Sequence, residues 1–431
     1  MKLLPADYSL NSLSTEILAG VTSFLATAYI VVVNPSILAQ AGMPFSGVLT
    51  ATVLVCFFSS LMMGVYARNP YVVAPGMGLN AFFTFTVVKG MQIPYTVALG
   101  AVFWSGVFFL LISVFNVRVL IVQAIPKSLR YGVAAGIGLF ITLIGLSNAY
   151  FIVSNPATLL SVGPLTPGVL IFLAGLALTA FLIQKKVTGA VLWGIVITSL
   201  IASTQGRLWG EETLIEWKGF FAAPDFSLLF ALDLKNSLSW SMAPIIFAFV
   251  FTDLFDSVST FVGLAEASGR LDAHGEPLQL KESLLTDAVS TTIAGLVGSS
   301  PGTAYVESAV GIEAGGKTGL TAITAALCFL PCLFLSPILS IIPSVATAPA
   351  LVLVGVFMIP TVLKINWDTW HEAVPAYLAM VLIPFTYSIT QGIIWGFLSY
   401  AFLKIAAGKV RDISLSLWLI IGLSILALIL E

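Results

Sequence analysis

The chain has 431 residues, of which 58% are hydrophobic and only 9% are charged, and its mean hydropathy is +1.05. Soluble domains have roughly 25% charged residues, so no soluble fold of this length can bury so much apolar surface, and lipid must cover the excess. The net charge of -2 argues against a nucleic-acid partner.

Apolar stretches with the length that a spanning helix needs, about 20 residues, recur along the whole chain. In chain order we predict fourteen spans, at residues 17–39, 46–66, 71–88, 95–115, 128–148, 167–184, 187–204, 238–264, 283–298, 301–315, 318–336, 345–363, 371–386 and 388–406. A further apolar stretch, 413–430, is either a fifteenth span or a helix packed alongside the others.

Lysine and arginine residues are distributed unevenly between the loops. With a cytoplasmic N-terminus, fourteen of the 18 basic residues fall on the inner side, and the four on the outer side are Lys89, Arg207, Lys218 and Lys235. Cytoplasmic loops of membrane proteins are rich in these residues, so the pattern predicts this orientation in a bacterial inner membrane.

Two of the predicted spans carry Pro and Gly where a spanning helix should begin. One reads Asn-Pro-Tyr-Val-Val-Ala-Pro-Gly-Met-Gly-Leu-Asn over 69–80, and the other reads Gly-Ser-Ser-Pro-Gly-Thr-Ala-Tyr-Val-Glu over 298–307. Irregular backbone at membrane depth must be buried in protein or line a wet cavity. Paired broken helices therefore point to the midplane binding site of a transporter.

The two halves of the chain resemble each other weakly. The third and tenth segments are both broken, and Leu-Trp-Gly-Ile at 192–195 in the seventh resembles Ile-Trp-Gly-Phe at 394–397 in the fourteenth. Because an odd number of segments separates each pair, the second half would lie inverted relative to the first. The sequence thus predicts two inverted seven-segment repeats, unless these short matches arise by chance.

Charge inside a span is costly and marks function by default, and three acidic side chains qualify as candidates. Asp253 and Asp256 are three residues apart on one face of the eighth span, and Glu307 begins the half-helix of the tenth. No Lys or Arg lies in these stretches, so the carboxylates are candidate proton carriers and hydrogen-bond partners of a polar ligand. The alternative is a structural role, as helix caps or partners of Ser and Thr hydroxyls.

Other candidates lie near the same breaks. Asn80 opens the half-helix of the third span and either caps that helix or reaches the ligand. Phe82 and Phe83 follow it and offer stacking surfaces to a flat heteroaromatic ligand, unless they face lipid or the core. Thr27-Ala28-Tyr29, in the middle of the first span, either lines the same cavity or packs. Asp287 is either an interfacial residue or a member of a relay. His274 and His371 lie too far apart in the sequence to indicate a metal site.

Three stretches carry a resemblance to a known family: residues 73–83 (Val-Ala-Pro-Gly-Met-Gly-Leu-Asn-Ala-Phe-Phe), 251–256 (Phe-Thr-Asp-Leu-Phe-Asp) and 299–308 (Ser-Ser-Pro-Gly-Thr-Ala-Tyr-Val-Glu-Ser). They resemble the AzgA-like branch of the nucleobase–cation symporter-2 family, the hypoxanthine, guanine and adenine permeases. The resemblance covers roughly residues 14–406. It implies an all-α polytopic membrane protein with two inverted seven-segment repeats, as in the uracil permease, and with short strands in segments 3 and 10.

The resemblance also implies a division into two domains and a way of working. The expected parts are a core domain (14–115 and 238–336), a gate domain (116–204 and 337–408), an outer loop (205–237) and a C-terminal hydrophobic segment (409–431). Members of the family are proton symporters, often dimers, whose core moves against the gate in an elevator-like motion.

Carried over by motif, Asp253 and Glu307 hold the base, and Asn80 and Asp256 match further positions important for transport. The distant uracil and xanthine relatives carry Glu or Gln at the first two positions, and the shorter Asp253 leaves more room for a two-ring base. The candidates for proton coupling are Asp253, Asp256 and Glu307. The predicted substrate-binding set is Asp253, Glu307, Asn80, Phe82, Phe83, Thr27 and Ser308.

The sequence therefore predicts a secondary active transporter, not an enzyme, that imports a purine base with a proton and needs no other cofactor. Its expected partners are the base, the proton, the bilayer and a second copy of the chain. Rival functions are a carrier of the same architecture for an anion, xanthine or uracil, an intramembrane enzyme, and a channel. The acids argue against an anion site, and the absence of any His deep within a predicted span argues against an enzyme.

Overall fold

The structure, a computed structural model, describes residues 10–114, 126–204, 219–271 and 277–410 and seven further positions between 413 and 425. Part of the predicted loop 205–237, His274 and most of the stretch 413–430 therefore lie outside the described residues. The long helices are α1 (Leu10–Thr27), α2 (Ile30–Leu38), α3 (Phe45–Met62), α5 (Tyr95–Val114), α7 (Lys127–Asn148), α8 (Pro167–Gln184), α9 (Ala190–Ala202), α10 (Ala243–Ala267), α11 (Leu280–Val297), α13 (Gly319–Phe329), α15 (Ser344–Met358), α16 (Trp370–Thr386) and α17 (Ile389–Ala406).

Short elements complete the chain. The strands are β1 (Val73–Pro75), β2 (Ile152–Asn155), β3 (Leu159–Val162) and β4 (Gly302–Ala304). The short helices are α4 (Met77–Ala81), α12 (Ser308–Glu313), α14 (Ser336–Leu339), the π-helices η2 (Met63–Ala67) and η3 (Phe82–Gly90), and the 3₁₀ turns η1 (Ala39–Ala41), η4 (Asn236–Leu238), η5 (Trp240–Met242), η6 (Leu330–Phe334) and η7 (Ile359–Lys364).

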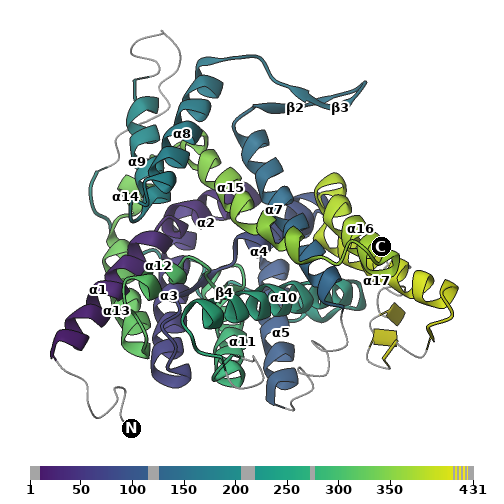
Figure 1. Ribbon diagram of the computed structural model, residues 1–431. Coiled ribbons are helices and arrows are strands. Elements are labelled where there is room, and N and C mark those ends of the chain that lie inside the picture. The colour runs from purple at the N-terminus through teal and green to yellow at the C-terminus, as the bar shows by residue number, and fades with distance from the viewer. Residues whose placement is uncertain are drawn as a thin grey trace.

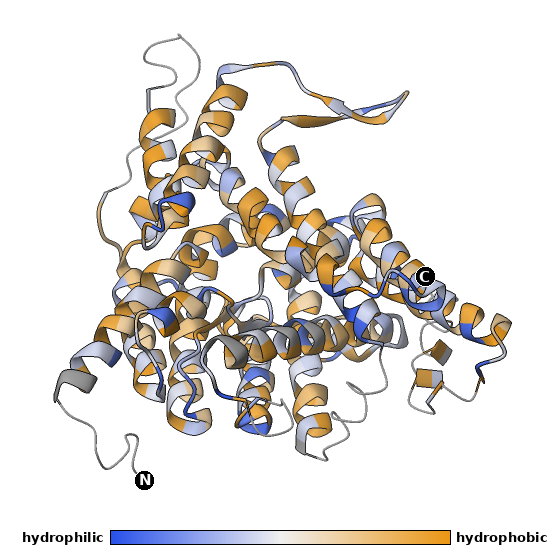
Figure 2. Ribbon diagram, in the orientation of Figure 1, coloured by the Kyte–Doolittle hydropathy of each residue, from blue (hydrophilic) through white to orange (hydrophobic). Residues whose placement is uncertain are grey.

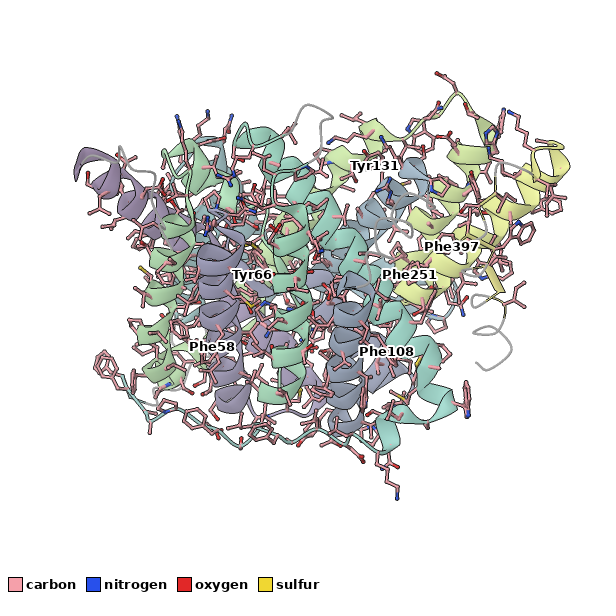
Figure 3. All side chains as sticks on the ribbon, turned by 90° about the horizontal axis from the view of Figure 1, so that it is seen from below. Phe58, Tyr66, Phe108, Tyr131, Phe251 and Phe397 are labelled. Carbon is pink, nitrogen blue, oxygen red and sulfur yellow. The ribbon has the colours of Figure 1, made fainter. Side chains whose placement is uncertain are left out.

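Eight helical stretches of the described chain are long and apolar enough to cross a membrane. They coincide with predicted spans 1, 2, 4, 5, 6, 8, 12 and 14, and Figure 2 shows the apolar residues along these helices and the polar ones mainly at helix ends and in loops. Exposed rings such as those of Phe58, Tyr66 and Phe108 point outward from α3, η2 and α5 (Figure 3), as lipid-facing side chains do. The protein is thus an integral membrane protein.

The other six predicted spans are shorter, broken or more polar. The helices α9, α13 and α16 have 13, 11 and 17 residues, and α11 carries the buried carboxylate of Asp287. The segments that contain α4 and α12 begin as strands. The first span is also interrupted, because α1 ends at Thr27 and α2 begins at Ile30.

The helices pack in two groups. In one group α5 packs along α11, α1 along α12 and α13, and α3 against α2, α11 and α13. In the other, α16 packs on α7 and α17, and α15 packs on α7, α8 and α9. Figure 1 shows the second group above and to the right of the first, with the hairpin β2–β3 projecting beyond it. Far fewer contacts join the groups, chiefly α4 with α7, α10 with α17, α2 with α15 and α1 with α9.

Small residues let helices approach closely within each group, as is usual when lipid rather than water surrounds a bundle. A Cβ added to Gly106 of α5 would lie 2.4 Å from the Thr292 nitrogen of α11. In the other group, a Cβ on Gly132 of α7 would lie 2.4 Å from the Ala376 oxygen of α16. Both distances are well inside van der Waals contact, so each group depends on glycine at these positions.

A strap, defined here as residues 219–238, ties one end of the first group together. Its backbone nitrogens at Ala222, Phe230 and Asp233 donate to carbonyls at the ends of η6, α11 and α5. The strap also carries Asp225, whose Oδ2 accepts a hydrogen bond of 2.6 Å from the Ser46 hydroxyl at the start of α3. The strap therefore binds the ends of four elements of this group, η6, α11, α5 and α3.

Candidate functional site

The two broken segments meet in the interior of the protein. Strand β1 pairs antiparallel with β4, so that Val73 lies opposite Ala304 and Pro75 opposite Gly302. All six strand residues are buried, and the Gly76 nitrogen extends the pairing by donating to the Pro301 carbonyl at 2.9 Å. This confirms the predicted short strands in segments 3 and 10. It also satisfies backbone groups that lipid could not.

Each strand leads into a half-helix, and Glu307 stands at the start of one of them. Glu307 is the N-cap residue of α12, yet its side chain makes no capping hydrogen bond. Instead, its Oε1 accepts a hydrogen bond of 2.6 Å from the Tyr29 hydroxyl, which lies in the break between α1 and α2. Tyr29 is 1% exposed, whereas Glu307 is half-buried. The capping alternative for Glu307 is thus not what the structure shows.

The two aspartates of α10 have different surroundings. Asp253 is buried, and its Oδ2 accepts a hydrogen bond of 2.6 Å from the Thr291 hydroxyl of α11. Asp256, one turn further on, is half-buried and close enough to Glu307 for the two charges to repel. The structure therefore brings Asp256 toward Glu307, while Asp253 is bound to the helix behind.

A second buried carboxylate belongs to Asp287 of α11. Its Oδ2 accepts a hydrogen bond from the Ser257 hydroxyl of α10, and the Ser257 oxygen lies 2.9 Å from the Thr303 hydroxyl in β4. Asp287 is fully buried. This chain of hydrogen bonds joins α11, α10 and the strand pair, and it places Asp287 beside the candidate site.

Asn80 lies within α4 and does not cap it. Its Nδ2 donates to the Oδ1 of Asn34 in α2 at 2.8 Å, and both side chains are fully buried. The Thr27 hydroxyl donates to the Ser23 carbonyl of its own helix at 2.8 Å, and the Ser308 hydroxyl accepts from the Val72 nitrogen at 2.9 Å. In the structure, Thr27 and Ser308 thus use their hydroxyls in backbone hydrogen bonds.

The two predicted stacking rings are fully buried. Phe82 meets Phe249 of α10 edge to face, with ring centroids 4.9 Å apart. Phe251, on the same helix, meets Phe397 of α17 edge to face, with ring centroids 6.1 Å apart. Both residues are labelled in Figure 3. Phe82 lies between the half-helix and α10, and Phe83 belongs to the same apolar core.

Sequence reasoning missed several members of this site. Tyr29 was singled out only together with its neighbours, and Asn34, Ser257, Thr291 and Thr303 were not identified. The available signal was weak: each is a polar residue within an apolar stretch, and the sequence contains many such Ser and Thr residues.

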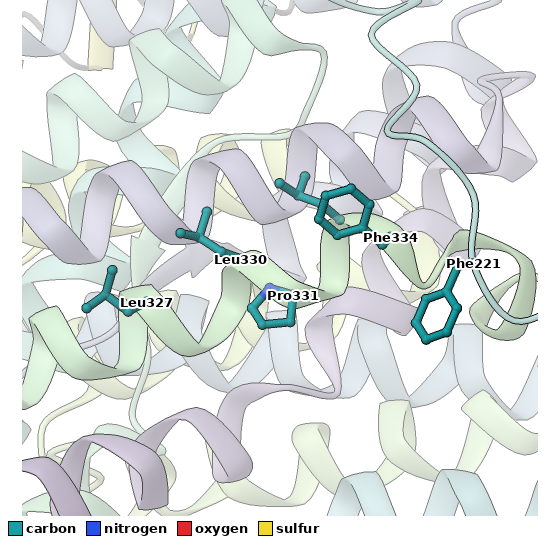
Figure 4. A pocket seen from close by; sticks show the side chains of 6 residues that line it. Phe221, Leu327, Leu330, Pro331 and Phe334 are labelled. Carbon is teal, nitrogen blue, oxygen red and sulfur yellow. The ribbon is translucent and has the colours of Figure 1, made fainter.

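A surface groove of about 680 Å³ lies elsewhere, between the strap and α13 (Figure 4). All six side chains that line it are apolar, so it lacks polar side chains that could recognise a nucleobase. Within the described part of the chain, no three His, Cys, Asp or Glu residues gather as metal ligands.

The fold and this site, with carboxylates beside two interrupted helices inside a polytopic bundle, define a membrane transporter architecture. The same fold occurs in the transmembrane domain of a cyanobacterial bicarbonate transporter, BicA (TM-score 0.64, 18% identity, 90% of this chain and 98% of that one). It also occurs in SLC26A9 (TM-score 0.64, 11% identity, 93% of this chain and 66% of that one).

Sequence comparison places the chain within this class. A family model for xanthine/uracil-type permeases, described as the Permease family, matches residues 14–394, and the chain belongs to that family. Its relatives include the adenine permease AdeP of Escherichia coli, 42% identical over 93% of this chain and 89% of the relative. The guanine/hypoxanthine permease PbuO of Bacillus subtilis is 40% identical over 94% of both chains. These relatives confirm the AzgA-like resemblance.

Proposed function

We propose that the protein imports purine nucleobases by proton symport across the bacterial inner membrane. The observation that carries this proposal is the position of Glu307, held by Tyr29 at the start of a half-helix inside the protein. Relatives named as adenine and guanine/hypoxanthine permeases support a purine as the substrate.

The chemistry of the site suits a nucleobase. A purine presents N–H donors and ring-nitrogen acceptors along its edges. A carboxylate accepts two N–H groups, and its acid form also donates. The site that we propose keeps Glu307, Asp253 and Asn80 as base contacts, with Phe82 and Phe83 as aromatic walls. Thr27 could still accept a hydrogen bond from the base and Ser308 could still donate one, because each backbone hydrogen bond uses only part of the capacity of the hydroxyl.

The proton would be carried by one of the three carboxylates Asp253, Asp256 and Glu307. Asp256 and Glu307 are the pair whose charges interact, so protonating either one relieves repulsion at the other. One proton moving inward across about 100 mV supplies about 2.3 kcal/mol, enough to drive accumulation of a neutral base about fiftyfold.

The proposed architecture has fourteen segments in two inverted repeats with the N-terminus in the cytoplasm. The helix group with α1–α5 and α10–α13 would be the core domain, and the group with α7–α9 and α15–α17 the gate. The sparse contacts between the groups support an elevator-like motion of one against the other, in a monomer or in a homodimer. An anion substrate is disfavoured, because two half-buried carboxylates would repel it.

The decisive variant is Glu307→Gln, which keeps the size of the side chain and removes its charge and proton. We expect proton-coupled uptake of radiolabelled hypoxanthine, guanine or adenine to be abolished while the protein still reaches the membrane. The matched control is Glu313→Gln, at the exposed end of α12. Uptake at the wild-type rate by Glu307→Gln would overturn the proposal.

A competition experiment identifies the purine that the protein prefers. Uptake of labelled hypoxanthine is measured with each unlabelled base in excess, with and without a protonophore. Loss of accumulation with the protonophore is the expected result. Accumulation that persists without a proton gradient would exclude proton symport, and uptake that never saturates would indicate a channel.

A further inference from the structure

The side chain of Asn80 belongs to a buried chain of hydrogen bonds that begins at α3. The Thr52 hydroxyl donates to the Val48 carbonyl of its own helix at 2.7 Å, which uses its only proton. Its oxygen must then accept the next bond, and Asn34 Nδ2 lies 2.8 Å away. Asn34 Nδ2 also donates to the Ser299 hydroxyl oxygen at 3.2 Å.

This arrangement fixes which way both amides point. With its nitrogen used toward Thr52, Asn34 presents its Oδ1 to the next side chain, and Asn80 Nδ2 donates to that oxygen at 2.8 Å. A flipped Asn80 would set two carbonyl oxygens against each other. The Asn34 side chain therefore fixes the Asn80 amide so that its remaining atom, Oδ1, is a hydrogen-bond acceptor.

Asn80 Oδ1 is buried and has no hydrogen-bond partner among the residues that the structure describes. The same is true of the hydroxyl of Thr84, four residues further along the same segment, and of Thr252 on α10. The two segments meet where Phe82 packs on Phe249, three residues before Thr252. Buried polar atoms nearly always have partners, so an unpaired amide oxygen on the half-helix segment suits a polar ligand as its missing partner.

From this geometry we infer that Asn34 is a specificity-determining positioning residue: it holds Asn80 so that Oδ1 accepts an N–H of the transported base. The inference rests on the proposed function and deepens it. Asn34 itself does not touch the base. A base whose ring N–H at that position is methylated would leave Asn80 Oδ1 unpaired and would bind about tenfold to a hundredfold less tightly.

The experiment compares inhibition of hypoxanthine uptake by hypoxanthine and by its 1-methyl, 7-methyl and 9-methyl derivatives. In the wild type, we expect one methyl position to weaken inhibition most. In Asn34→Leu, the amide of Asn80 can turn, so the loss of affinity that methylation at that position causes should become about tenfold smaller. The losses of affinity caused by methylation at the other two positions should persist. A methyl group rejected only by its size would be rejected equally by both proteins.

A second set of variants tests the same prediction in case Asn34→Leu does not fold. Asn34 Oδ1 also accepts a hydrogen bond of 3.3 Å from the Ser300 hydroxyl. Thr52→Val combined with Ser299→Ala and Ser300→Ala therefore removes every hydroxyl that orients the Asn34 amide and should make the same loss of affinity smaller. Thr52→Ser keeps the hydroxyl and should match the wild type. Thermal unfolding of each purified protein checks the fold. Equal methyl penalties in the wild type and in every folded variant that transports would overturn the role of Asn34. Failure of the wild type itself to transport any purine would instead overturn the proposed function.

Discussion

At the residue scale, the hydroxyl of Tyr29 determines how Glu307 is presented. It occupies Oε1 and leaves the second carboxylate oxygen for a ligand or a proton. The two residues are 278 positions apart in the chain. Tyr29 lies at the short turn between α1 and α2, and α1 packs along α12, the half-helix that Glu307 precedes.

We predict that Tyr29→Phe lowers kcat/KM for purine uptake about tenfold to a hundredfold, because a hydrogen bond to a charged group contributes about 1.5–3 kcal/mol. Initial uptake rates at several base concentrations test this. The control is Tyr150→Phe, whose side chain is 71% exposed and outside the site. An unchanged kcat/KM in Tyr29→Phe would mean that Glu307 keeps its orientation without the hydroxyl.

At the element scale, two carboxylates fasten helices to one another outside the transport site. Glu16 of α1 is buried and accepts hydrogen bonds from the backbone nitrogens of Lys317 and Thr318, at 3.1 and 3.3 Å, so it anchors the residues that lead into α13. The strap carries the other, Asp225, which binds Ser46 at the start of α3. Neither link follows from periodicity, since each joins residues far apart in the sequence.

The pKa of the Asp225 carboxyl lies below its ordinary value of 3.8, mainly because the Ser46 hydroxyl and the Ser227 nitrogen donate to the charged form. The folded state therefore binds the proton less readily than the unfolded state. Its stabilisation is complete above the ordinary pKa and is lost as the pH falls through the lower, folded value.

Accordingly, we predict that Asp225→Asn lowers the Tm of the detergent-purified protein near neutral pH by about 1–2 °C. The difference from the wild type should vanish in acid, well below pH 3.8. The control is Asp368→Asn, in an exposed turn before α16. A difference in Tm that stays constant down to that acid range would show that the carboxylate charge of Asp225 contributes nothing.

At the scale of the whole molecule, the two helix groups meet where α4 touches α7. A Cβ built on Gly78 would lie 3.8 Å from the Cβ of Ile137, the separation typical of a disulfide. Within one group, the hydroxyl oxygens of Ser59 and Ser290 lie 2.7 Å apart. These two places allow a cross-link between the groups to be compared with one inside a group.

In a background without Cys56, Cys328 and Cys332, we predict that Gly78→Cys with Ile137→Cys stops uptake when oxidised, by about tenfold or more, and that dithiothreitol restores it. If the groups move against each other, Ser59→Cys with Ser290→Cys should form its disulfide and still transport. Full uptake by the oxidised Gly78–Ile137 pair, with the cross-link confirmed by mobility on a gel, would exclude the proposed motion.

The sequence alone was sufficient for the membrane class, the positions of the long helices, the two broken segments and the family. Each depends on local composition or short motifs: long apolar runs partition into lipid, and Pro and Gly at 75–76 and 301–302 interrupt a helix wherever they occur. The carboxylates stood out for the same reason, because charge within an apolar run is conspicuous without any structure.

Only the tertiary structure decided which of these groups meet. It set Tyr29 against Glu307, turned Asp253 toward Thr291, and fixed the amide of Asn80 through Asn34. Helix spacing predicts that two aspartates three residues apart share a face, but not which partner each one meets. The partner depends on how distant helices pack and on which buried donors and acceptors remain to be satisfied, and those constraints exist only once the chain is folded.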